Sequence, residues 1–309
     1  MIRLAPALPR AWHLLDAASL ASLLREGCEL VLLEVGCGPD ADLHHGHIPG
    51  ARLLDIATLE EAPFFNKVSD KVLVERLARL GVRHDSMVVL YGRHNSLAAA
   101  RAAHLMLYAG VSGVRLLDGG LAEWRRAGMP CAHIAAPVPE PSGDFGAAYP
   151  ARPDLLCSST DVRRHLRTGD ATLASIRTRN EYLGRTSGYC YIDARGEIPG
   201  ARWGQAGCEG DIHSMSSYQL ADGCTRPAQE IAAMWAQSGI GPQRPTIFYC
   251  GTGWRASLAF FYAYLMGWDS ISVYDGGWLE WSSDPANPVV CFDDFPTPVT
   301  CASATSTAK

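Results

Sequence analysis

The segment Thr246-Ile247-Phe248-Tyr249-Cys250-Gly251-Thr252-Gly253-Trp254-Arg255 joins an apolar run to a cysteine, two glycines and an arginine. The apolar run predicts a buried strand, and the apolar stretch that starts at Trp254 predicts a helix. The two glycines between them predict a tight loop, because glycine adopts backbone conformations that other residues avoid. The segment therefore predicts a strand, a loop and a helix N-terminus with a thiol at the centre.

This position favours a reactive Cys250. Successive backbone N–H groups of such a loop converge on one point, and the helix dipole adds partial positive charge there. A thiol in that field is expected to ionise near neutral pH and to act as a nucleophile. Arg255 supports this interpretation, because a cation in the first turn of a helix is unfavourable unless an anion lies nearby. The alternative is that Cys250 is a small buried packing residue.

Composition and charge disfavour some classes of partner. A chain of 309 residues can form two domains, each with its own core. Its formal net charge of -5 disfavours nucleic acid and anionic membranes, because both select for an excess of Lys and Arg. No apolar run reaches the ~18 residues of a membrane span. Prolines interrupt the start, Met1–Pro9, before a signal-peptide core could form. We therefore expect a cytoplasmic protein, if Met1 is the native start.

The ten cysteines contain no Cys-x-x-Cys pair, so a zinc site is not expected. Disulfides are not expected either, because a chain of this length needs no covalent staples. Cys291 and Cys301 lie in a tail rich in Pro, Thr and Ser, and we expect both to be accessible to solvent. The sequence gives no indication of a cofactor.

The chain contains an internal repeat. Each half has, in the same order, an apolar run, a Gly-x-Ile-Pro-Gly-Ala-Arg motif, a second apolar run and an Asp-Gly-Gly-x-x-x-Trp motif. They occupy residues 31–35, 46–52, 87–91 and 118–124 in the first half, and 172–176, 196–202, 245–249 and 275–281 in the second. The shared order predicts two domains with one fold.

Within each half, short apolar runs alternate with longer apolar stretches such as Ser96–Tyr108 and Trp254–Met266, which end at Gly110 and Gly267. Strands that are apolar throughout are covered on both faces. We therefore predict two α/β domains, each a mostly parallel sheet with helices on both faces. Cys250 then lies beyond the carboxyl end of a strand, where such sheets bind ligands. The predicted boundaries are 10–134 for the first domain, 135–153 for a proline-rich extended linker, 154–290 for the second domain and 291–309 for a flexible tail.

These landmarks resemble the rhodanese family of sulfurtransferases, in particular the tandem-domain type that includes thiosulfate and mercaptopyruvate sulfurtransferases. The resemblance covers most of the chain, because the Gly-x-Ile-Pro-Gly-Ala motif, the strand before the loop and the Asp-Gly-Gly motif each occur twice. The loop Cys250-Gly251-Thr252-Gly253 is similar to the Cys-Gly-Ser-Gly loop of the mercaptopyruvate enzymes. The family's Gly-His-Ile-Pro-Gly motif also accounts for His47, so no metal is expected at His44, His45 and His47.

The two halves differ at the loop. When Tyr91 is aligned with Tyr249, Gly92 stands in the place of Cys250. The following residues, Arg93-His94-Asn95-Ser96-Leu97, lack both the loop glycines and the closing arginine. The first domain therefore has no nucleophile. The resemblance implies that it is a non-catalytic partner that walls the active-site cleft.

The resemblance implies that Cys250 attacks the sulfane sulfur of a donor, keeps it as a persulfide and passes it to a thiophilic acceptor. Backbone N–H groups from Gly251 to Arg255 would stabilise the persulfide anion without a general base. Gly251 and Gly253 would let these groups converge. Thr252 either donates a hydroxyl hydrogen bond, as the serine at this place does in the mercaptopyruvate enzymes, or caps the following helix.

Four further residues are candidates for substrate binding. Arg255 is expected to pair with the anionic donor through a bidentate fork. Trp254 either walls the donor site or packs in the core. Arg185 and Arg195 precede the second Gly-x-Ile-Pro-Gly motif, where the mercaptopyruvate enzymes carry two carboxylate-binding arginines. The residues between them match poorly, so these arginines are either substrate ligands or solvated surface residues.

Two positions depart from the family pattern. The strand that ends in Asp-x-Arg in the family reads Ser175-Ile176-Arg177 here, so an aspartate that would anchor the loop region is absent. Glu197 stands where the second-domain motif usually has histidine. Neither change affects the nucleophile.

The predicted function is transfer of sulfane sulfur from a small anionic donor, thiosulfate or 3-mercaptopyruvate, to a thiophilic acceptor such as cyanide or a thiol. One alternative is a relay or regulatory module that delivers sulfur to a thiol-bearing protein. Another is a phosphatase or arsenate reductase, since dual-specificity phosphatases and arsenate reductases related to rhodaneses also close a cysteine loop with arginine. The phosphatase loop is Cys-x5-Arg, one residue longer than the Cys-x4-Arg from Cys250 to Arg255, which disfavours this alternative.

Overall fold

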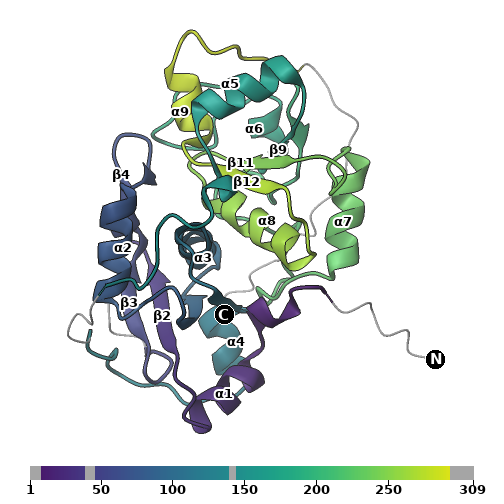
Figure 1. The fold of residues 1–309 in the computed structure, drawn as a ribbon. Coiled ribbons are helices and arrows are strands. Elements are labelled where there is room, and N and C mark those ends of the chain that lie inside the picture. The colour runs from purple at the N-terminus through teal and green to yellow at the C-terminus, as the bar shows by residue number, and fades with distance from the viewer. Residues whose placement is uncertain (1–7, 39–45, 139–143, 293–309) are drawn as a thin grey trace.

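The computed structural model describes residues 8–38, 46–138 and 144–292, which form two α/β domains (Figure 1). The first domain contains a parallel five-stranded sheet in the order β1-β7-β6-β2-β3. Its strands are β1 (Leu14–Leu15), β2 (Val31–Gly36), β3 (Arg52–Asp55), β6 (Met87–Gly92) and β7 (Gly113–Leu117), and its helices are α1 (Ala17–Arg25), α2 (Asp70–Arg79), α3 (Leu97–Ala109) and α4 (Gly120–Arg126).

The second domain repeats this arrangement with a parallel sheet in the order β10-β9-β11-β12-β8. This confirms the predicted pair of α/β domains. The strands are β8 (Leu156–Cys157), β9 (Thr172–Ser175), β10 (Arg202–Trp203), β11 (Thr246–Tyr249) and β12 (Ile271–Tyr274), and the helices are α5 (Ser159–Thr168), α6 (Arg179–Tyr182), α7 (Ala228–Gln237), α8 (Trp254–Leu265) and α9 (Gly277–Ser283).

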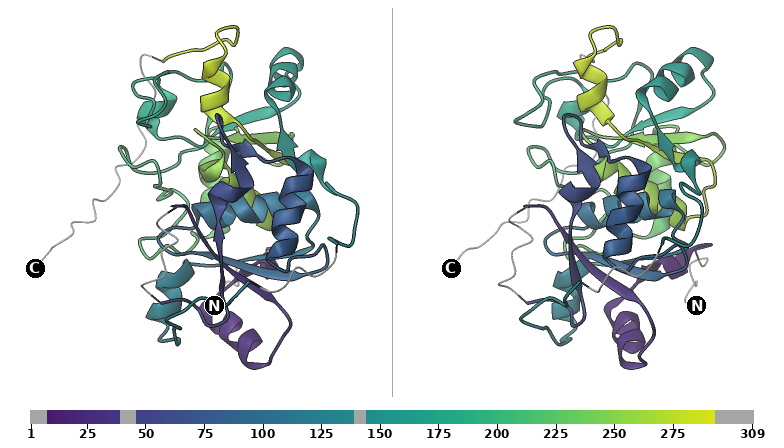
Figure 2. Two further views of the ribbon diagram at one scale, coloured as in Figure 1. Left: turned by 90° about the vertical axis from the view of Figure 1, so that its left-hand side faces the viewer. Right: turned by 60° about the vertical axis from the view of Figure 1, so that its left-hand side comes forward.

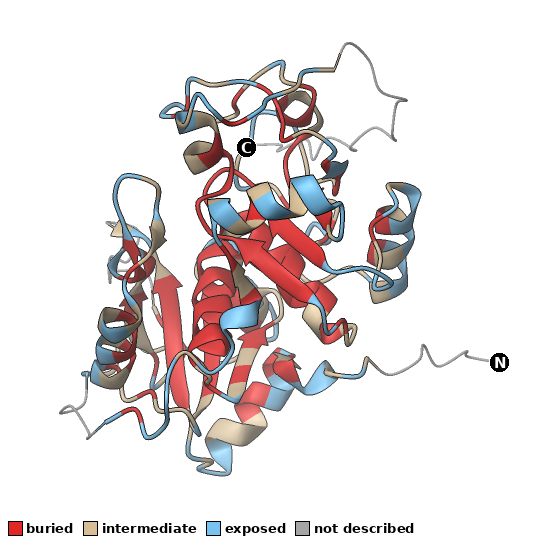
Figure 3. Cartoon of the chain, turned by 45° about the horizontal axis from the view of Figure 1, so that its top comes forward, coloured by how far each residue is buried: buried red, intermediate tan, exposed pale blue. Residues whose placement is uncertain are grey.

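Helices cover both faces of each sheet. On β6, Val88 and Leu90 pack with residues of α2 and α3, whereas Val89 and Tyr91 pack with residues of α1 and α4. The side chains of β11 are divided in the same way, between α7 and α8 on one face and α5 and α9 on the other. In consequence β11 is buried along its whole length and β6 along all but its first residue, Met87, while the outer helices keep an exposed face (Figure 3).

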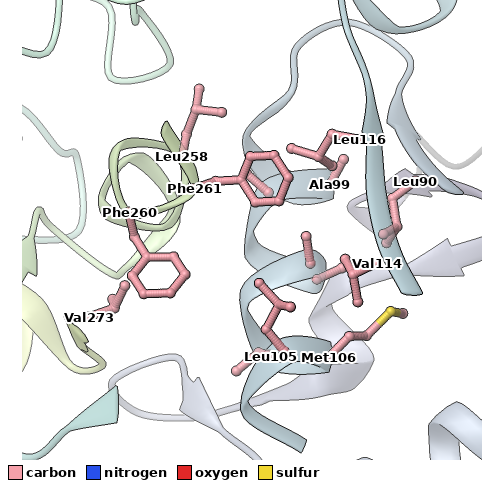
Figure 4. Packing of buried hydrophobic residues seen from close by; sticks show 14 of the residues in the cluster. Leu90, Ala99, Leu105, Met106, Val114, Leu116, Leu258, Phe260, Phe261 and Val273 are labelled. Atoms are coloured by element: carbon pink, nitrogen blue, oxygen red, sulfur yellow. The ribbon is translucent and has the colours of Figure 1, made fainter. Parts of the chain in front are cut away.

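The two domains share one hydrophobic core where α3 and α8 pack together. All residues of α3 are buried, as expected of a mostly apolar helix, and the buried residues include Arg101 and His104. Leu258, Phe260 and Phe261 of α8 lie opposite Ala99 and Leu105 of α3 in this core (Figure 4). Both helices end as predicted, at left-handed Gly110 after α3 and Gly267 shortly after α8. Burial of this much apolar surface between the domains favours a fixed relative position.

A short hairpin of the first domain reaches the second domain. It consists of β4 (Glu60–Glu61) and β5 (Asn66–Lys67), which pair antiparallel, and it extends alongside the second domain in both views of Figure 2. The backbone N–H of Lys67 donates to Asp275 Oδ2 over 2.8 Å. In the reverse direction, the backbone N–H of Thr225 donates to Asp118 Oδ1, also over 2.8 Å. Asp118 and Asp275 are the first residues of the two Asp-Gly-Gly motifs, so each motif holds a segment of the other domain.

Two predicted connecting segments are more firmly attached than their composition suggests. In the described part of the predicted linker, Phe145 is buried in the shared core, and Ala151 N–H bonds to Ala109 O. At the start of the predicted tail, Phe292 stacks on Tyr182 and donates its N–H to Leu183 O. Cys291 is exposed, as expected, whereas Cys301 lies outside the described residues.

No helix within the described ranges has the length and apolar character needed to cross a membrane. The same ranges hold no cluster of three or more His, Cys, Asp or Glu side chains suited to a metal ion. His47 is buried and bonds to Glu34, whereas His44 and His45 lie outside the described residues.

Candidate active site

Cys250 lies where the sequence predicts it, in the loop between β11 and α8. Only 1% of Cys250 is exposed, so the thiol is buried. Gly253 has φ +92°, a left-handed conformation that other residues adopt only with strain. This conformation turns the chain directly into α8, whose first residue is Trp254. The predicted strand, loop and helix are therefore present with the predicted bounds.

The N-terminus of α9 fixes the orientation of the loop peptides. Trp278 N–H donates to Cys250 O over 2.8 Å, and Leu279 N–H donates to Gly251 O over 3.0 Å. In a trans peptide the N–H points opposite to the C=O. The N–H groups of Gly251 and Thr252 therefore point away from α9. Two loop amides are held in a fixed direction, as an anion-binding nest requires.

Gly251 is required by a close neighbour. A Cβ atom at this position would lie 2.2 Å from the ring of Tyr189, which no side chain could tolerate without displacement. Tyr189 in turn accepts a hydrogen bond from Arg255 Nη2 through its hydroxyl, over 2.7 Å. Burial raises the pKa of Tyr189, so its hydroxyl stays neutral in the folded protein. The cysteine loop is thus packed against Tyr189, which Arg255 holds in place.

The structure gives Arg255 a partner that the sequence did not reveal. Arg255 Nη1 and Nη2 form a bidentate pair with the Glu181 carboxylate over 2.9 and 2.8 Å, and both side chains are 1% exposed. Burial raises the pKa of Glu181, but the charge and hydrogen bonds of Arg255, the charge of Arg177 and the N–H of Thr178 together outweigh it and leave the pKa below its ordinary value. The positive charge that was expected to bind the donor is therefore balanced inside the protein. Its role as a donor ligand stays a prediction.

A cavity of ≈ 250 Å³ lies beside the loop and is built by both domains. The cysteine loop and the start of α8 contribute Thr252, Trp254 and Arg255, and the segment before the second Gly-x-Ile-Pro-Gly motif contributes Tyr189 and Tyr191. Phe65, Tyr189 and Tyr191 form a row of rings, with centroids 5.7 Å and 5.4 Å apart. Among the described residues that line the cavity, Arg255 is the sole arginine or lysine. The lining residues are Cys37, Ala57, Glu60, Phe65, Leu97, Tyr189, Tyr191, Ile212, His213, Thr252, Trp254 and Arg255.

The first domain supplies a carboxylate to this cavity. Glu60 accepts a hydrogen bond from Trp254 Nε1, 3.0 Å from Oε1 and 3.1 Å from Oε2, and another from Arg101 Nε over 2.9 Å. Arg101 also donates to Asp275 Oδ1 over 2.5 Å. Burial raises the pKa of Glu60 to about 7, although Arg101 partly opposes the shift. The first domain therefore does more than wall the cleft.

The other predicted substrate residues divide into two groups. Thr252 and Trp254 line the cavity, and the Trp254 indole is also tied to Glu60, so it both packs and faces the site. Arg185 and Arg195 are exposed, and neither belongs to the residues that line the cavity. The structure does not bring these two arginines to the loop. Their assignment as substrate ligands stays an untested prediction.

The two departures from the family pattern, at Ser175 and Glu197, compensate for each other. In the first domain, Glu34 on β2 pairs with His47 and accepts from the hydroxyl of Tyr91. In the second domain the carboxylate belongs to Glu197, at the position that corresponds to His47. Glu197 accepts a hydrogen bond from Ser175 Oγ over 2.6 Å and another from the Tyr249 hydroxyl. A buried carboxylate thus anchors the tyrosine before the loop in both domains. The aspartate that the sequence lacks is replaced by Glu197.

The residues that sequence reasoning missed lie on other segments. Asp275 had a signal, because it opens a duplicated motif. Tyr189 and Tyr191 lie in the segment that matched the family poorly, and Glu181 and Glu60 had no signal in the sequence. Glu60 is 194 positions from Trp254 and Glu181 is 74 from Arg255. Contacts over such separations depend on the whole fold.

Comparison with known proteins identifies relatives of both halves. The rhodanese-like domain model matches residues 16–127 and 158–284. The thiosulfate sulfurtransferase YnjE of Escherichia coli is 51% identical over 243 residues, which are 79% of this chain and 55% of YnjE. The chain thus spans little more than half the length of that relative. The sulfur carrier protein TtuD of Thermus thermophilus is 30% identical over 258 residues, 79% of this chain and 85% of TtuD.

Solved structures agree with these relatives. The crystal structure of YnjE has a TM-score of 0.88 and 45% identity, covering 93% of this chain and 70% of that one. The anaerobic ergothioneine biosynthesis enzyme from Chlorobium limicola, solved with trimethyl histidine, has a TM-score of 0.87 and 37% identity, covering 92% and 71%. Related structures of EanB include a tyrosine variant with a cysteine persulfide and ergothioneine, and a threonine variant with hercynine. This chain belongs to the rhodanese family, with two rhodanese-like domains in tandem.

Proposed function

We propose that this chain is a sulfurtransferase that carries sulfane sulfur as a persulfide on Cys250. The observation that supports this most is the orientation of the loop. Backbone N–H groups of α9 bind the carbonyls of Cys250 and Gly251, so the N–H groups of Gly251 and Thr252 point away from α9. Fixed amides of this kind stabilise an anionic sulfur without a mobile cation. The first domain has Gly92 at the corresponding place, so the chemistry is confined to one loop.

Thiosulfate is the donor that we propose first, because YnjE, named a thiosulfate sulfurtransferase, is 51% identical to this chain. 3-Mercaptopyruvate is the second, since an enzyme of that name from Escherichia coli is 27% identical. A thiol-bearing protein is a further acceptor to test, because TtuD is named a sulfur carrier protein. The cytoplasm remains a prediction from the sequence that cell fractionation would test.

The test is persulfide formation followed by turnover. The protein is incubated with thiosulfate, and the Cys250 peptide is examined by mass spectrometry for the addition of one sulfur atom. Cys250→Ser should abolish both this addition and sulfur transfer to cyanide. Cys208→Ser serves as the matched control and should retain both. Transfer by Cys250→Ser at the wild-type rate would show that another thiol is the nucleophile.

A second candidate function concerns the acceptor. In EanB the substituted tyrosine precedes the persulfide cysteine by 59 positions, and the substituted threonine follows that cysteine by two. Tyr191 and Thr252 stand at the same two distances from Cys250, and both line the cavity. Aromatic faces attract quaternary ammonium groups. The row of Phe65, Tyr189 and Tyr191 therefore suits the trimethylammonium group of trimethyl histidine better than an anion.

In this reaction the sulfane sulfur would be inserted at a carbon–hydrogen bond of the imidazole ring as C–SH, while Cys250 returns to a thiol. The persulfide supplies the oxidised sulfur, so no further oxidant is needed. Persulfidated protein is mixed with trimethyl histidine and the product is analysed for ergothioneine by mass spectrometry. Product that is absent with Cys250→Ser supports this function. No product above that background, from protein that still transfers sulfur to cyanide, would exclude it.

A further inference from the structure

The cavity beside Cys250 contains a carboxylate that comes from the domain without a cysteine. Glu60 lies on β4, and its side chain is 3% exposed. It lines the cavity together with Thr252 from the loop and Trp254 from the start of α8. Both the Trp254 indole and Arg101 donate to it, so the carboxylate is held in one place. Its second oxygen, Oε2, is contacted by the indole alone among the described hydrogen bonds.

The other carboxylates near the loop are fully engaged. Both oxygens of Glu181 bind the Arg255 guanidinium, and Oε2 also accepts from Thr178 N–H. Asp275 accepts from Arg101 and from Lys67 N–H and does not line the cavity. Glu60 therefore has the best-placed oxygen to receive a proton from a bound acceptor.

The surroundings of Glu60 bring the pKa of its carboxyl group close to neutral pH. Burial raises the pKa of Glu60 to about 7, and Arg101 and Trp254 oppose that rise. A base with a pKa near the working pH is effective in proton transfer. The other titratable or charged groups that line the cavity or pack behind Glu60 are Cys37, Lys67, Asp70, Arg101, Tyr189, Tyr191, His213, Arg255 and Asp275.

We propose that Glu60 is the proton acceptor for the second half of the reaction, in which a thiol takes the sulfur from Cys250. The proposal rests on the proposed sulfurtransferase function. Glu60 removes the proton of the acceptor thiol, and the electron pair left on the acceptor attacks the outer sulfur of the persulfide. The bond between the two sulfurs breaks, and its electron pair returns to Cys250 as a thiolate. The acceptor leaves as a persulfide, and no oxidant or reductant is consumed.

The test compares an acceptor that must lose a proton with one that need not. Persulfidated protein is mixed with dithiothreitol or with sulfite, and discharge of Cys250 is followed by mass spectrometry. A free thiol is only a few per cent ionised at about pH 7, so Glu60→Gln should slow discharge to dithiothreitol by about tenfold or more. Discharge to sulfite should be unchanged. The wild-type rate with the thiol should rise as the pH rises through about 7, where Glu60 loses its proton, and then level off. The Glu60→Gln rate should instead follow the ionisation of the thiol itself and increase through this range without levelling off.

Two further variants complete the test. Glu61→Gln changes the exposed neighbour on the same strand and should behave as wild type. His213→Gln changes another side chain of the cavity lining that could accept a proton, and it should not show the thiol-specific loss expected of Glu60→Gln. Equal losses with thiol and sulfite in Glu60→Gln would show a structural role and overturn the proposal. A thiol-specific loss in His213→Gln in place of Glu60→Gln would also overturn it. If wild-type Cys250 never acquires sulfur from thiosulfate, it is the sulfurtransferase function itself that fails.

Discussion

The pair between Arg255 and Glu181 leads to a prediction that separates two roles for the arginine. Arg255→Met removes the cation that binds both oxygens of Glu181, whose side chain is 1% exposed, and two charge-assisted bonds are lost. The remaining cation is Arg177, whose Nε lies 3.8 Å from Glu181 Oε1. Breaking a buried ion pair from one side costs about 3–5 kcal/mol. A domain has about 5–15 kcal/mol of stability in total, so the variant should unfold at a clearly lower urea concentration.

The second part of this prediction is partial rescue. In the double variant Arg255→Met with Glu181→Gln, the buried charge that keeps only Arg177 as a partner is gone, and the glutamine oxygen can still accept from Thr178 N–H. We expect it to regain about 2 kcal/mol or more relative to the single variant, because a neutral polar group is much less costly to bury than a charge. Urea unfolding of the three proteins, monitored by tryptophan fluorescence, measures both effects.

Activity decides which role Arg255 has. If it positions Tyr189 and the loop, Arg255→Met should slow persulfide formation from thiosulfate and from 3-mercaptopyruvate by similar factors. A stability within about 0.5 kcal/mol of wild type, together with a loss confined to thiosulfate, would refute this reasoning. That outcome would restore the role expected from the sequence, a direct ligand of the anionic donor.

Three further predictions follow from single contacts. Gly251→Ala places a Cβ atom 2.2 Å from the Tyr189 ring, so it should cost about 1–3 kcal/mol and reduce persulfide yield; an unchanged yield by mass spectrometry would contradict the packing argument. Burial lowers the pKa of His104 from 6.5 to about 4, so its contribution to stability is complete above pH 6.5 and is lost as the pH falls toward 4. Urea unfolding across this pH range should show a smaller loss of stability in His104→Gln than in the wild type. Asp275→Asn weakens a contact to buried Arg101 beside the cavity, whereas Asp118→Asn weakens a contact to Thr225. The rate of sulfur transfer should fall more in Asp275→Asn, and equal rates in the two variants would argue against coupling between Asp275 and the site.

The sequence predicts the features of this fold that depend on local pattern. The apolar run of β11, the two loop glycines and the apolar stretch of α8 are contiguous, so their structure follows from residues within a few positions of each other. The repeat then predicts the second domain from the first. The bounds of α3 and α8 agree with the predicted stretches to within one residue, because Gly110 and Gly267 mark where each helix must end.

The electrostatics of the site could not be predicted in this way. Arg255 was expected to pair with the anionic donor, because a cation in the first turn of a helix is unfavourable unless an anion lies nearby. Its partner, Glu181, was not identifiable, because it is also the third residue of the short helix α6, where an acidic residue needs no other explanation than capping. From the sequence, the missing aspartate at Ser175 and the missing histidine at Glu197 were likewise two unrelated departures from the family pattern. In the fold, the two side chains meet and supply one carboxylate.

The duplication explains how a domain without a nucleophile became part of the active site. Each Asp-Gly-Gly aspartate accepts a backbone N–H from the opposite domain, Lys67 at Asp275 and Thr225 at Asp118. The two contacts are equivalent by position in the repeat, but only one lies beside a cysteine loop. There, the hairpin that Asp275 holds also carries Glu60 into the cavity, next to Trp254. The first domain, which has no counterpart of Cys250, therefore remains attached to the candidate site, because the cavity there takes one wall and a carboxylate from it.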